Sequence, residues 1–478
     1  MVMPKHSPVQ KILFGPPGSG KSFRAREIGV ELNVETDCTI EATFHPAYDY
    51  GDFVVKLLPM TVRRIRQFNG MGALEKQQIT PEAESAIEYR THVGHLIRAV
   101  AKALEVGPKK NVLLIIDEIN RGDCARIFGD IFQLLDRSLS GWSQYGVNLS
   151  DLAFSGLMKG LGWISMHQGT EIKWKKDDQI LAEGEIPEDI WTDTLDKPQE
   201  LKSLFSKIPV LHLPPNLSII GTMNTSDESV YYMDTAFKRR WSFEFIRWNY
   251  GPEDQPAIKT QRKIRIEGTD HTWEDFLKKL NNFIANSSSQ RRIDDKQVGL
   301  WFLRPNLSSL YLAFQKAAEK PSPTVNDWNL LGLVDAPGDA KQKIRGWNNG
   351  LKEYISNILE RDNLNNVYQQ LLAINEGDKE KYPSPRLAAI RLMRIGEANW
   401  GCYISAADIR CKLMHFLWDN VFSRDKEVLE NLIFKKNKGK LRTFDDFSMQ
   451  YKNFVNKVME DELTPIDNSG QLPPDDNA

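Results

Sequence analysis

The stretch of sequence that decides the fold is Gly15-Pro16-Pro17-Gly18-Ser19-Gly20-Lys21-Ser22. An apolar run at residues 11–14 precedes it and an amphipathic stretch follows it, so the glycines lie where a predicted strand meets a helix. A glycine-rich turn at such a point lets backbone N–H groups converge on anionic oxygens, and the positive end of the helix adds to the field. We therefore predict that this stretch binds the phosphates of a nucleotide, with Lys21 at the β- and γ-phosphates and the Ser22 hydroxyl on Mg²⁺.

Two adjacent carboxylates, Asp117 and Glu118, end a second predicted strand. The apolar run at residues 111–116 is typical of a strand that is buried on both faces. Catalytic groups of open α/β sheets lie at the carboxyl ends of such strands. Asp117 is predicted to organise the Mg²⁺ shell and Glu118 to polarise the attacking water. The alternative is that the two acidic residues simply cap the following helix.

A third short apolar strand is predicted at residues 216–223, and it too ends in a polar cluster. Asn224 is placed to contact the γ-phosphate or the attacking water. Asp227 closes the same cluster. We include both residues among the candidate catalytic residues.

Lys238, Arg239 and Arg240 interrupt an otherwise apolar passage from a helix to a strand. Three adjacent cations cannot all lie on one solvated face of a helix. We predict that Arg239 or Arg240 acts as an arginine finger on the nucleotide of a neighbouring subunit, where negative charge develops in the transition state. A surface patch, or a site for an acidic partner, is the alternative.

Taken together, these segments resemble the AAA+ NTPases of the McrB group, the motor subunits of modification-dependent restriction systems. The matching segments are GPPGSGKS at 15–22, FHPAYDYGDF at 44–53, LLIIDEINRG at 113–122 and IIGTMNTSD at 219–227, with weaker echoes at 294–299 and 412–418. The resemblance implies an α/β fold, with an AAA+ P-loop αβα core around a parallel sheet and a mostly helical lid domain. It also implies a ring-shaped oligomer, expected to be a hexamer, that hydrolyses ATP or GTP.

The same resemblance implies a separate nuclease partner and contact with DNA, directly or through that partner. The sequence also departs from the family pattern. Asp227 is followed by Glu228, where the family usually has arginine. Family members that recognise methylated DNA carry an amino-terminal DNA-binding domain, whereas few residues precede the first predicted strand here, so we expect target recognition to lie elsewhere.

Two other functions remain open at the level of sequence. A MoxR-like ATPase chaperone that remodels protein complexes would share the phosphate loop, the carboxylate pair and the asparagine. A nucleotide-dependent switch or scaffold with slow hydrolysis would share them as well. The choice between ATP and GTP is also open, because the loop binds phosphates rather than the base and no N/T-K-x-D motif is evident.

Composition agrees with an ordinary globular protein. The chain has 478 residues, of which 41% are hydrophobic and 26% charged, and its net charge of −2 argues against a protein that coats nucleic acid through a global basic charge. The four cysteines have no metal-ligand spacing, which predicts reduced thiols. No apolar run is long enough to span a bilayer and the amino terminus lacks a signal-peptide core, so we expect no membrane contact and a cytoplasmic location.

We predict a nucleotide-binding core at residues 1–250, interrupted by an insertion at about 137–212. The long insertion contains alternating segments typical of a hairpin. In it, Trp174 lies between two lysines and either stacks on a base or is half-buried in a solvated hairpin.

A helical lid domain is predicted at residues 251–434, with a strand at 298–303 and an elaboration at about 305–410. Arg304 and Arg386 each either act as a second-sensor arginine or are ordinary surface residues. Residues 435–478 are predicted to be a charged, partly disordered tail, whose basic part either follows a nucleic-acid backbone or is a solvated loop.

Overall fold

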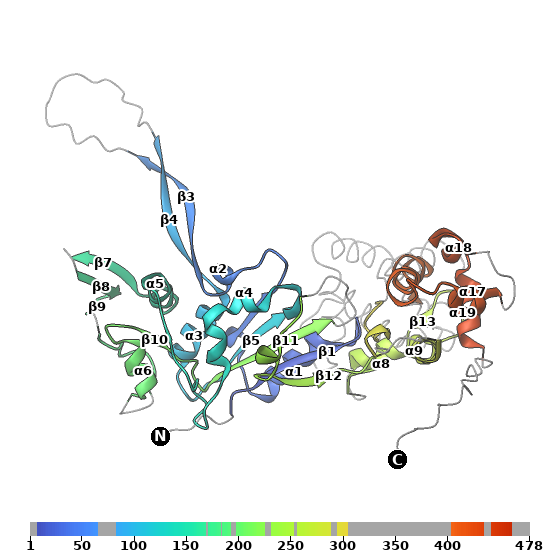
Figure 1. Ribbon diagram of the computed structural model, residues 1–478, viewed down its shortest axis with the longest axis horizontal. Coiled ribbons are helices and arrows are strands. Elements are labelled where there is room, and N and C mark those ends of the chain that lie inside the picture. Colours follow the sequence, from blue (N-terminus) through green and yellow to red (C-terminus); the bar gives the residue numbers. More distant parts are fainter. Residues whose placement is uncertain are drawn as a thin grey trace, which may run out of the picture. The chain divides into compact units, whose positions relative to one another are not determined.

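The computed structural model describes residues 7–65, 83–168, 171–182, 184–192, 197–224, 231–252, 256–287, 294–304, 403–434 and 441–460. The chain divides into two compact units, each described here by itself (Figure 1). Unit 1 comprises Met1–Phe14 and Lys21–Phe245, and unit 2 comprises Gly15–Gly20 and Ile246–Ala478. The predicted boundary at residue 250 lies near this division. The predicted core, however, contained the glycine-rich loop, which the structure groups with unit 2.

A five-stranded sheet forms the centre of unit 1. Its strands, in spatial order, are β12 (Ser242–Phe245), β1 (Gln10–Gly15), β11 (Leu217–Asn224), β5 (Val112–Asp117) and β2 (Thr39–Thr43). The pairs β1 with β12, β11 with β5, and β2 with β5 are parallel. This sheet confirms the predicted α/β class, and the three predicted strands at its centre are β1, β5 and β11.

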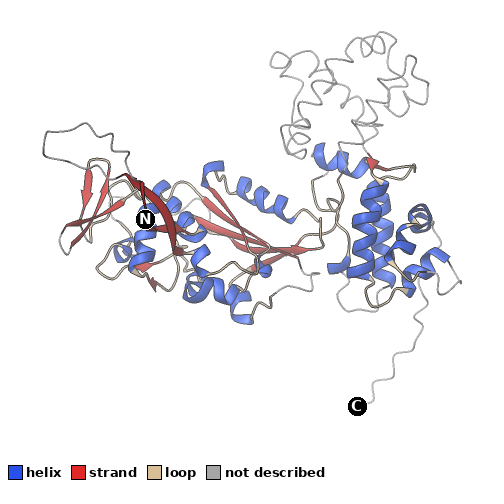
Figure 2. Cartoon of the chain, turned by 90° about the horizontal axis from the view of Figure 1, so that it is seen from above, coloured by secondary structure: helices blue, strands red, loops and turns tan. Residues whose placement is uncertain are grey.

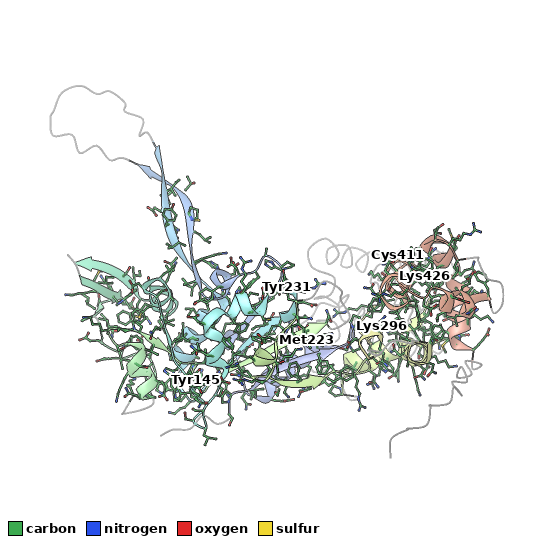
Figure 3. The ribbon with its side chains drawn as sticks, viewed as in Figure 1. Tyr145, Met223, Tyr231, Lys296, Cys411 and Lys426 are labelled. Atoms are coloured by element: carbon green, nitrogen blue, oxygen red, sulfur yellow. The ribbon has the colours of Figure 1, made fainter. Side chains whose placement is uncertain are left out.

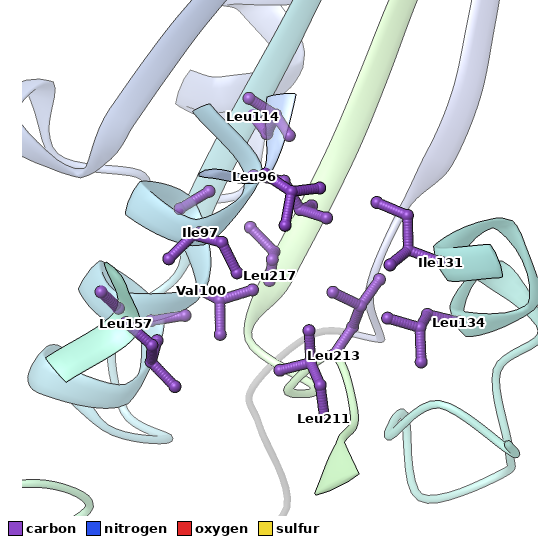
Figure 4. Packing of buried hydrophobic residues seen from close by; sticks show 14 of the residues in the cluster. Leu96, Ile97, Val100, Leu114, Ile131, Leu134, Leu157, Leu211, Leu213 and Leu217 are labelled. Atoms are coloured by element: carbon purple, nitrogen blue, oxygen red, sulfur yellow. The ribbon is translucent and has the colours of Figure 1, made fainter. Parts of the chain in front are cut away.

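Helices cover both faces of this sheet. Adjacent residues of a strand point to opposite faces, and in β5 Leu113 lies against Gly29 of α1 (Lys21–Glu31). Leu114 instead shares a buried cluster with residues such as Leu96 and Val100 of α3 (His95–Val106) (Figure 4). The predicted αβα layering is therefore confirmed. The remaining helical segments up to η3 are η1 (Thr36–Cys38), α2 (Tyr50–Phe53), η2 (Ile119–Arg121), α4 (Cys124–Phe128) and η3 (Gly129–Leu135).

A two-stranded ribbon in unit 1 was not predicted. Strand β3 (Val55–Ile65) pairs with β4 (Ala83–Val93) along its whole length in an antiparallel register. The ribbon extends away from α2 and α5 (Asp151–Gly160) (Figure 1). Its side chains do not alternate cleanly between apolar and polar, since Leu57, Met60 and Tyr89 are all exposed. The usual period-two signal is consequently weak in its sequence.

The insertion after η3 folds as part of unit 1. It contains β6 (Val147–Asn148) paired with β10 (Val210–Leu211), helices α5 and α6 (Gln199–Leu204), and a three-stranded antiparallel sheet of β7 (Ile164–Gln168), β8 (Glu171–Lys176) and β9 (Gln179–Leu181). The predicted hairpin is confirmed as β8 and β9. Trp174 is only 7% exposed and packs edge-on against Phe154. The suggestion that Trp174 stacks on a base is therefore wrong, because its ring already lies in the hydrophobic core.

Arg137 attaches the start of this insertion to the central sheet. Its Nε donates to Oε1 of Gln10 at 2.6 Å, and its Nη2 donates to the carbonyl oxygen of Leu217 at 3.0 Å. Its Nη1 donates to the carbonyl oxygens of Gly141, Leu213 and Pro214. The planar guanidinium thus joins β1, β11 and both ends of the insertion through one side chain.

Replacing Arg137 by methionine removes these donors and leaves carbonyl oxygens without their partners. We expect Arg137→Met to lower the free energy of unfolding by about 1–3 kcal/mol, measured by urea denaturation. Arg137→Lys is the matched control, because lysine keeps the charge but cannot present planar guanidinium donors. We expect the lysine variant to lose most of the same stability. A lysine variant as stable as the wild type would show that charge, and not donor geometry, matters here.

Unit 2 is mostly helical (Figure 2). Its elements are α8 (Pro256–Lys263), β13 (Arg265–Ile266), α9 (Trp273–Ser287), η4 (Asp294–Lys296), β14 (Tyr403–Ile404), α16 (Ala406–Asp408), the π-helical turns η7 (Ile409–Met414) and η8 (Leu417–Val421), α17 (Glu427–Phe434), α18 (Phe444–Ser448) and α19 (Tyr451–Met459). The predicted apolar face of α9 is confirmed, since Phe276, Leu280 and Ile284 are fully buried.

One prediction for unit 2 is wrong. Residues 298–303 form turns and not a strand, because their backbone N–H groups bond to the carbonyl oxygens of Pro17, Gly18 and Trp248 instead of to a strand. Of the predicted charged tail, residues 441–460 belong to the folded unit. Helices α18 and α19 bury Phe447 and Phe454, which pack edge-on against each other in the core.

No helix in the part of the chain that the structure describes is long and apolar enough to cross a membrane. Among the described residues, Cys38, Cys124 and Cys411 are free thiols, and Cys402 lies outside the described residues. Cys411 and Lys426 lie in the carboxy-terminal part of unit 2 (Figure 3).

Candidate functional site

Asp117 is held at the end of β5 by two hydroxyl groups. The Ser22 hydroxyl, in the first turn of α1, donates to Oδ1 of Asp117 at 3.2 Å. The Thr222 hydroxyl donates to the same oxygen and accepts a hydrogen bond from the backbone N–H of Glu118 at 3.2 Å. The strand register explains why Thr222 contacts Asp117. Ile116 of β5 pairs with Gly221 of β11 in parallel, so the residues that follow them, Asp117 and Thr222, are neighbours. Ser22 and Asp117, the predicted Mg²⁺ ligands, are thus brought together.

Glu118 and Asn224 form a second contact at the same sheet edge. Nδ2 of Asn224 donates to Oε1 of Glu118 at 2.6 Å, and the guanidinium of Arg121 lies 3.7 Å from Oε2. Glu118 has a left-handed backbone, with φ 55° and ψ 44°. Non-glycine residues rarely adopt this conformation, and where they do the surrounding structure must compensate for the strain. The chain therefore turns sharply immediately after Asp117.

The capping alternative for these carboxylates does not hold. Glu118 precedes η2 but makes no side-chain capping hydrogen bond. Helix α4 is capped by Asp123, whose carboxylate accepts from the backbone N–H of Arg126. Since another aspartate satisfies the helix end, Asp117 and Glu118 are available for the contacts described above.

Asn120 is a site residue that the sequence analysis missed. It is 3% exposed, its Nδ2 donates to the carbonyl oxygen of Asn224 at 2.6 Å, and its own carbonyl oxygen accepts from the backbone N–H of Tyr231. Met223 and Tyr231 are both labelled in Figure 3. Asn120 thereby positions the backbone that carries Asn224. The only sequence signal was an amide residue two positions after Glu118.

The glycine-rich loop lies in unit 2 and has the backbone that a phosphate loop requires. Gly18 and Gly20 have φ values of 74° and 96°, which favour glycine. A Cβ on Gly18 would also lie 2.4 Å from the backbone nitrogen of Phe302. Ser19 is fully buried, and its hydroxyl has no hydrogen-bond partner among the described residues. An unpartnered buried hydroxyl within the loop fits a site whose ligand carries acceptor oxygens.

Lys21 follows Gly20 directly and is only 8% exposed. Lysine is almost never buried to this extent unless anionic or carbonyl groups surround its ammonium group. The oxygen donors of Ser22 and Asp117 fit Mg²⁺, which prefers hydroxyl, carboxylate and water ligands. The residues present therefore fit both a phosphate group and a magnesium ion.

The two candidate finger arginines, Arg239 and Arg240, lie in different environments. Arg240 is engaged within its own chain: its side chain is 6% exposed, and its Nη2 lies 2.6 Å from Oδ2 of Asp136. Its guanidinium also lies 4.4 Å from the ring centroid of Phe132 and donates to the carbonyl oxygen of Ala236. Arg239 is exposed at the end of α7 (Thr235–Lys238). In this structure Arg240 is therefore a packing residue, and Arg239 alone of the pair presents its charge to solvent.

This difference predicts unequal effects of the two arginines on the free energy of unfolding. Arg240→Ala should lower the free energy of unfolding by about 3 kcal/mol, because it removes the partner of a largely buried carboxylate. Arg239→Ala should change it by less than about 0.5 kcal/mol, as is usual for an exposed side chain. Urea denaturation of the two variants side by side measures both effects. Equal losses would contradict the assignment.

The FHPAYDY segment forms an aromatic core and not a ligand site. Phe44 stacks on Tyr48, with ring centroids 4.8 Å apart, and meets Phe53 edge-on. The hydroxyl of Tyr48 lies 2.7 Å from Nδ1 of His95 in α3. All three aromatic residues are buried. The segment thereby anchors α2 at the base of the ribbon.

His95 makes this core sensitive to acid. Burial lowers the pKa of His95 below its ordinary value of 6.5, and the positive charge of Arg98 contributes. The unfolded chain therefore binds a proton at this position before the folded chain does, so the free energy of unfolding falls as pH drops below about 6.5. We expect His95→Gln to show a shallower fall when denaturation is measured from pH 7.5 to 5.5. An unchanged pH dependence would contradict this role for His95.

Some predicted residues cannot be placed. Asp227 and Arg386 lie outside the described residues, as do 305–402 of the predicted lid elaboration. Arg304 is described and exposed, and its guanidinium lies 5.6 Å from the ring centroid of Trp301.

No protein-family model matches the chain. Over 301 residues it is 29% identical to the type II restriction enzyme BsuMI component YdiS of Bacillus subtilis (strain 168), a match that covers 62% of this chain and 73% of that protein. Over 234 residues it is 25% identical to the type IV methyl-directed restriction enzyme EcoKMcrB subunit of Escherichia coli (strain K12). That second match covers 48% of this chain and 34% of the subunit.

Both relatives are components of restriction enzymes. The chain is thus similar to restriction-system proteins that include an McrB subunit, in line with the resemblance drawn from its motifs. The five-stranded parallel sheet agrees with an AAA+ P-loop core.

Proposed function

We propose that this protein is a nucleoside triphosphatase of the AAA+ type, which hydrolyses ATP or GTP as the motor subunit of a DNA restriction system. The observation that carries the proposal is the hydroxyl and carboxylate network of Ser22, Asp117 and Thr222, with the Glu118–Asn224 pair beside it. Gly20 precedes Lys21 by one peptide bond, so the chain itself links this network to the phosphate loop. Similarity to restriction-enzyme components supports the biological setting.

Each residue has a definite part in the proposed reaction. The backbone N–H groups of residues 15–20 and the ammonium group of Lys21 hold the phosphate oxygens. Ser22 and Asp117 hold Mg²⁺, which neutralises charge on the β- and γ-phosphate oxygens when it is bound. Glu118 orients and polarises the attacking water, while Asn224 positions the Glu118 carboxylate through its 2.6 Å hydrogen bond. We retain Asp227 as a candidate catalytic residue.

A ring oligomer, which we expect to be a hexamer, completes the proposed active site. Arg239 is exposed, and in the proposed ring it acts on the nucleotide of a neighbouring subunit, where a guanidinium stabilises charge that develops in the transition state. Arg240 instead forms an ion pair with Asp136 of its own chain.

Hydrolysis would drive movement along DNA or remodelling of it, in the cytoplasm, together with a separate nuclease subunit. The relatives' names, which are those of restriction-enzyme components, support this setting. DNA would be contacted directly or through that partner. No observation specifically favours the MoxR-like chaperone alternative.

The Glu118 assignment gives the first test. We expect Glu118→Gln to lower steady-state hydrolysis of ATP and GTP by at least about a hundredfold, because a general base contributes on the order of 10²–10⁴-fold. Nucleotide binding should persist, since the loop, Lys21 and Ser22 are intact. Glu41→Gln is the matched control, because it makes the same change at a carboxylate whose side chain is 53% exposed on β2.

The arrangement of subunits can be tested with the same proteins. Arg239→Ala and Glu118→Gln should each be inactive alone, but a mixture should regain activity, because some sites then combine an intact Glu118 with a neighbour's intact Arg239. No recovery would argue against shared sites. A Glu118→Gln protein as active as the wild type, or a wild type that hydrolyses neither nucleotide with or without double-stranded DNA, would overturn the proposed function.

A further inference from the structure

Two aromatic side chains of unit 2 lie beside the last glycine of the phosphate loop. A Cβ placed on Gly20 would lie 3.5 Å from Cδ1 and 3.7 Å from Nε1 of Trp301, and 3.8 Å from Cδ1 of Tyr250. All of these residues belong to unit 2. The pyrrole edge of the Trp301 indole therefore faces the loop at the residue that directly precedes Lys21.

The backbone fixes Trp301 in this position. Its N–H donates to the carbonyl oxygen of Gly18 at 2.8 Å, and the N–H of Gly299 donates to that of Pro17 at 2.9 Å. The neighbouring Leu300 donates to the carbonyl oxygen of Trp248 at 2.8 Å. The backbone that carries Trp301 is therefore held on the loop by main-chain bonds at this residue and at its two preceding neighbours.

Further side-chain contacts brace the same turn. Asn281 of α9 accepts from the N–H of Val298 at 2.7 Å and donates to its carbonyl oxygen at 2.9 Å. The ring of Phe302 packs against that of Phe416, with centroids 5.1 Å apart. The turn is thus rigid on the side away from the loop as well, and a rigid platform loses little entropy when a ligand binds.

The Trp301 indole also has an unused donor. Its Nε1 is buried, and no described residue accepts a hydrogen bond from it. Buried indole N–H groups usually have a partner. The guanidinium of Arg304 lies 5.6 Å from the centroid of the same ring and provides positive charge nearby. An aromatic surface, a free donor and a cation therefore occur together next to the loop.

We propose that Trp301 contacts the nucleoside part of the nucleotide whose phosphates the loop holds. This inference rests on the proposed function and extends it. The indole ring packs against the base or ribose, and its N–H donates to an acceptor on either. Because every base has a π-face, such a contact tolerates both adenine and guanine. Trp301 therefore strengthens the binding of ATP and GTP alike and does not choose between them.

Equilibrium binding of three probes to the full chain tests the proposal. ADP and GDP carry phosphates and a nucleoside, whereas tripolyphosphate carries phosphates alone. We expect Trp301→Ala to weaken ADP and GDP binding by about tenfold or more, in line with losses on removal of a stacking side chain, and to leave tripolyphosphate binding within about twofold. Calorimetric titration provides the dissociation constants. Trp418→Phe is a control for changing another tryptophan of unit 2, because the Trp418 ring packs under Lys426 and stacks on Phe447.

The outcomes separate this inference from the proposed function. If the wild type binds none of the three probes, the proposed function fails. If Trp301→Ala weakens all three equally, or weakens none, the nucleoside contact is overturned while the proposed function stands. If the alanine variant does not fold, Trp301→Phe decides: it keeps a ring but loses the N–H, so it should weaken ADP and GDP binding by about threefold or more and leave tripolyphosphate binding within about twofold. Unchanged binding of ADP and GDP by this variant would overturn the proposal.

Discussion

The parallel pairing of β5 with β11 is the constraint on which the rest of the candidate site depends. It places the ends of two buried strands side by side, so that Thr222 meets Asp117 and Asn224 meets Glu118. Thr222 is buried within β11. Asp117, Glu118 and Asn224 are half-buried and lie at or directly after the ends of their strands, where a carboxylate can remain charged and still be fixed by neighbouring donors.

The polar residues around the site are of two kinds: some hold the chain in place through hydrogen bonds, and one is exposed to solvent. Arg137, Asn120 and Arg240 use their donors to hold the chain: the first joins the insertion to the sheet, the second fixes the backbone at Asn224, and the third pairs with Asp136. Arg239, one residue away, carries the same charge and none of these contacts. Adjacent residues can therefore serve opposite purposes, because a helix end directs neighbouring side chains to different sides.

Sequence reasoning worked where one chemical requirement dominates a short segment. A glycine-rich turn, a buried apolar run and a terminal carboxylate each have few structural solutions, and so the glycine-rich turn between β1 and α1, and strands β5 and β11, were predicted. The sequence did not predict the structure of segments whose conformation depends on packing against distant parts of the chain. The ribbon of β3 and β4 lacks clean alternation, the 298–303 turn is shaped by the loop around Pro17 and Gly18, and α18 and α19 fold because they cover unit 2's core.

The sequence by itself determined the α/β class, the glycine-rich turn between a strand and a helix, and the residue types of the candidate site, because local spacing and buried periodicity are enough to specify these. Only the tertiary structure decided which residues meet. It paired Thr222 with Asp117, assigned Arg240 to the protein interior, buried Trp174 and brought Trp301 to Gly20. These contacts join residues far apart in the chain, and their geometry depends on strand register and packing, which no local pattern encodes.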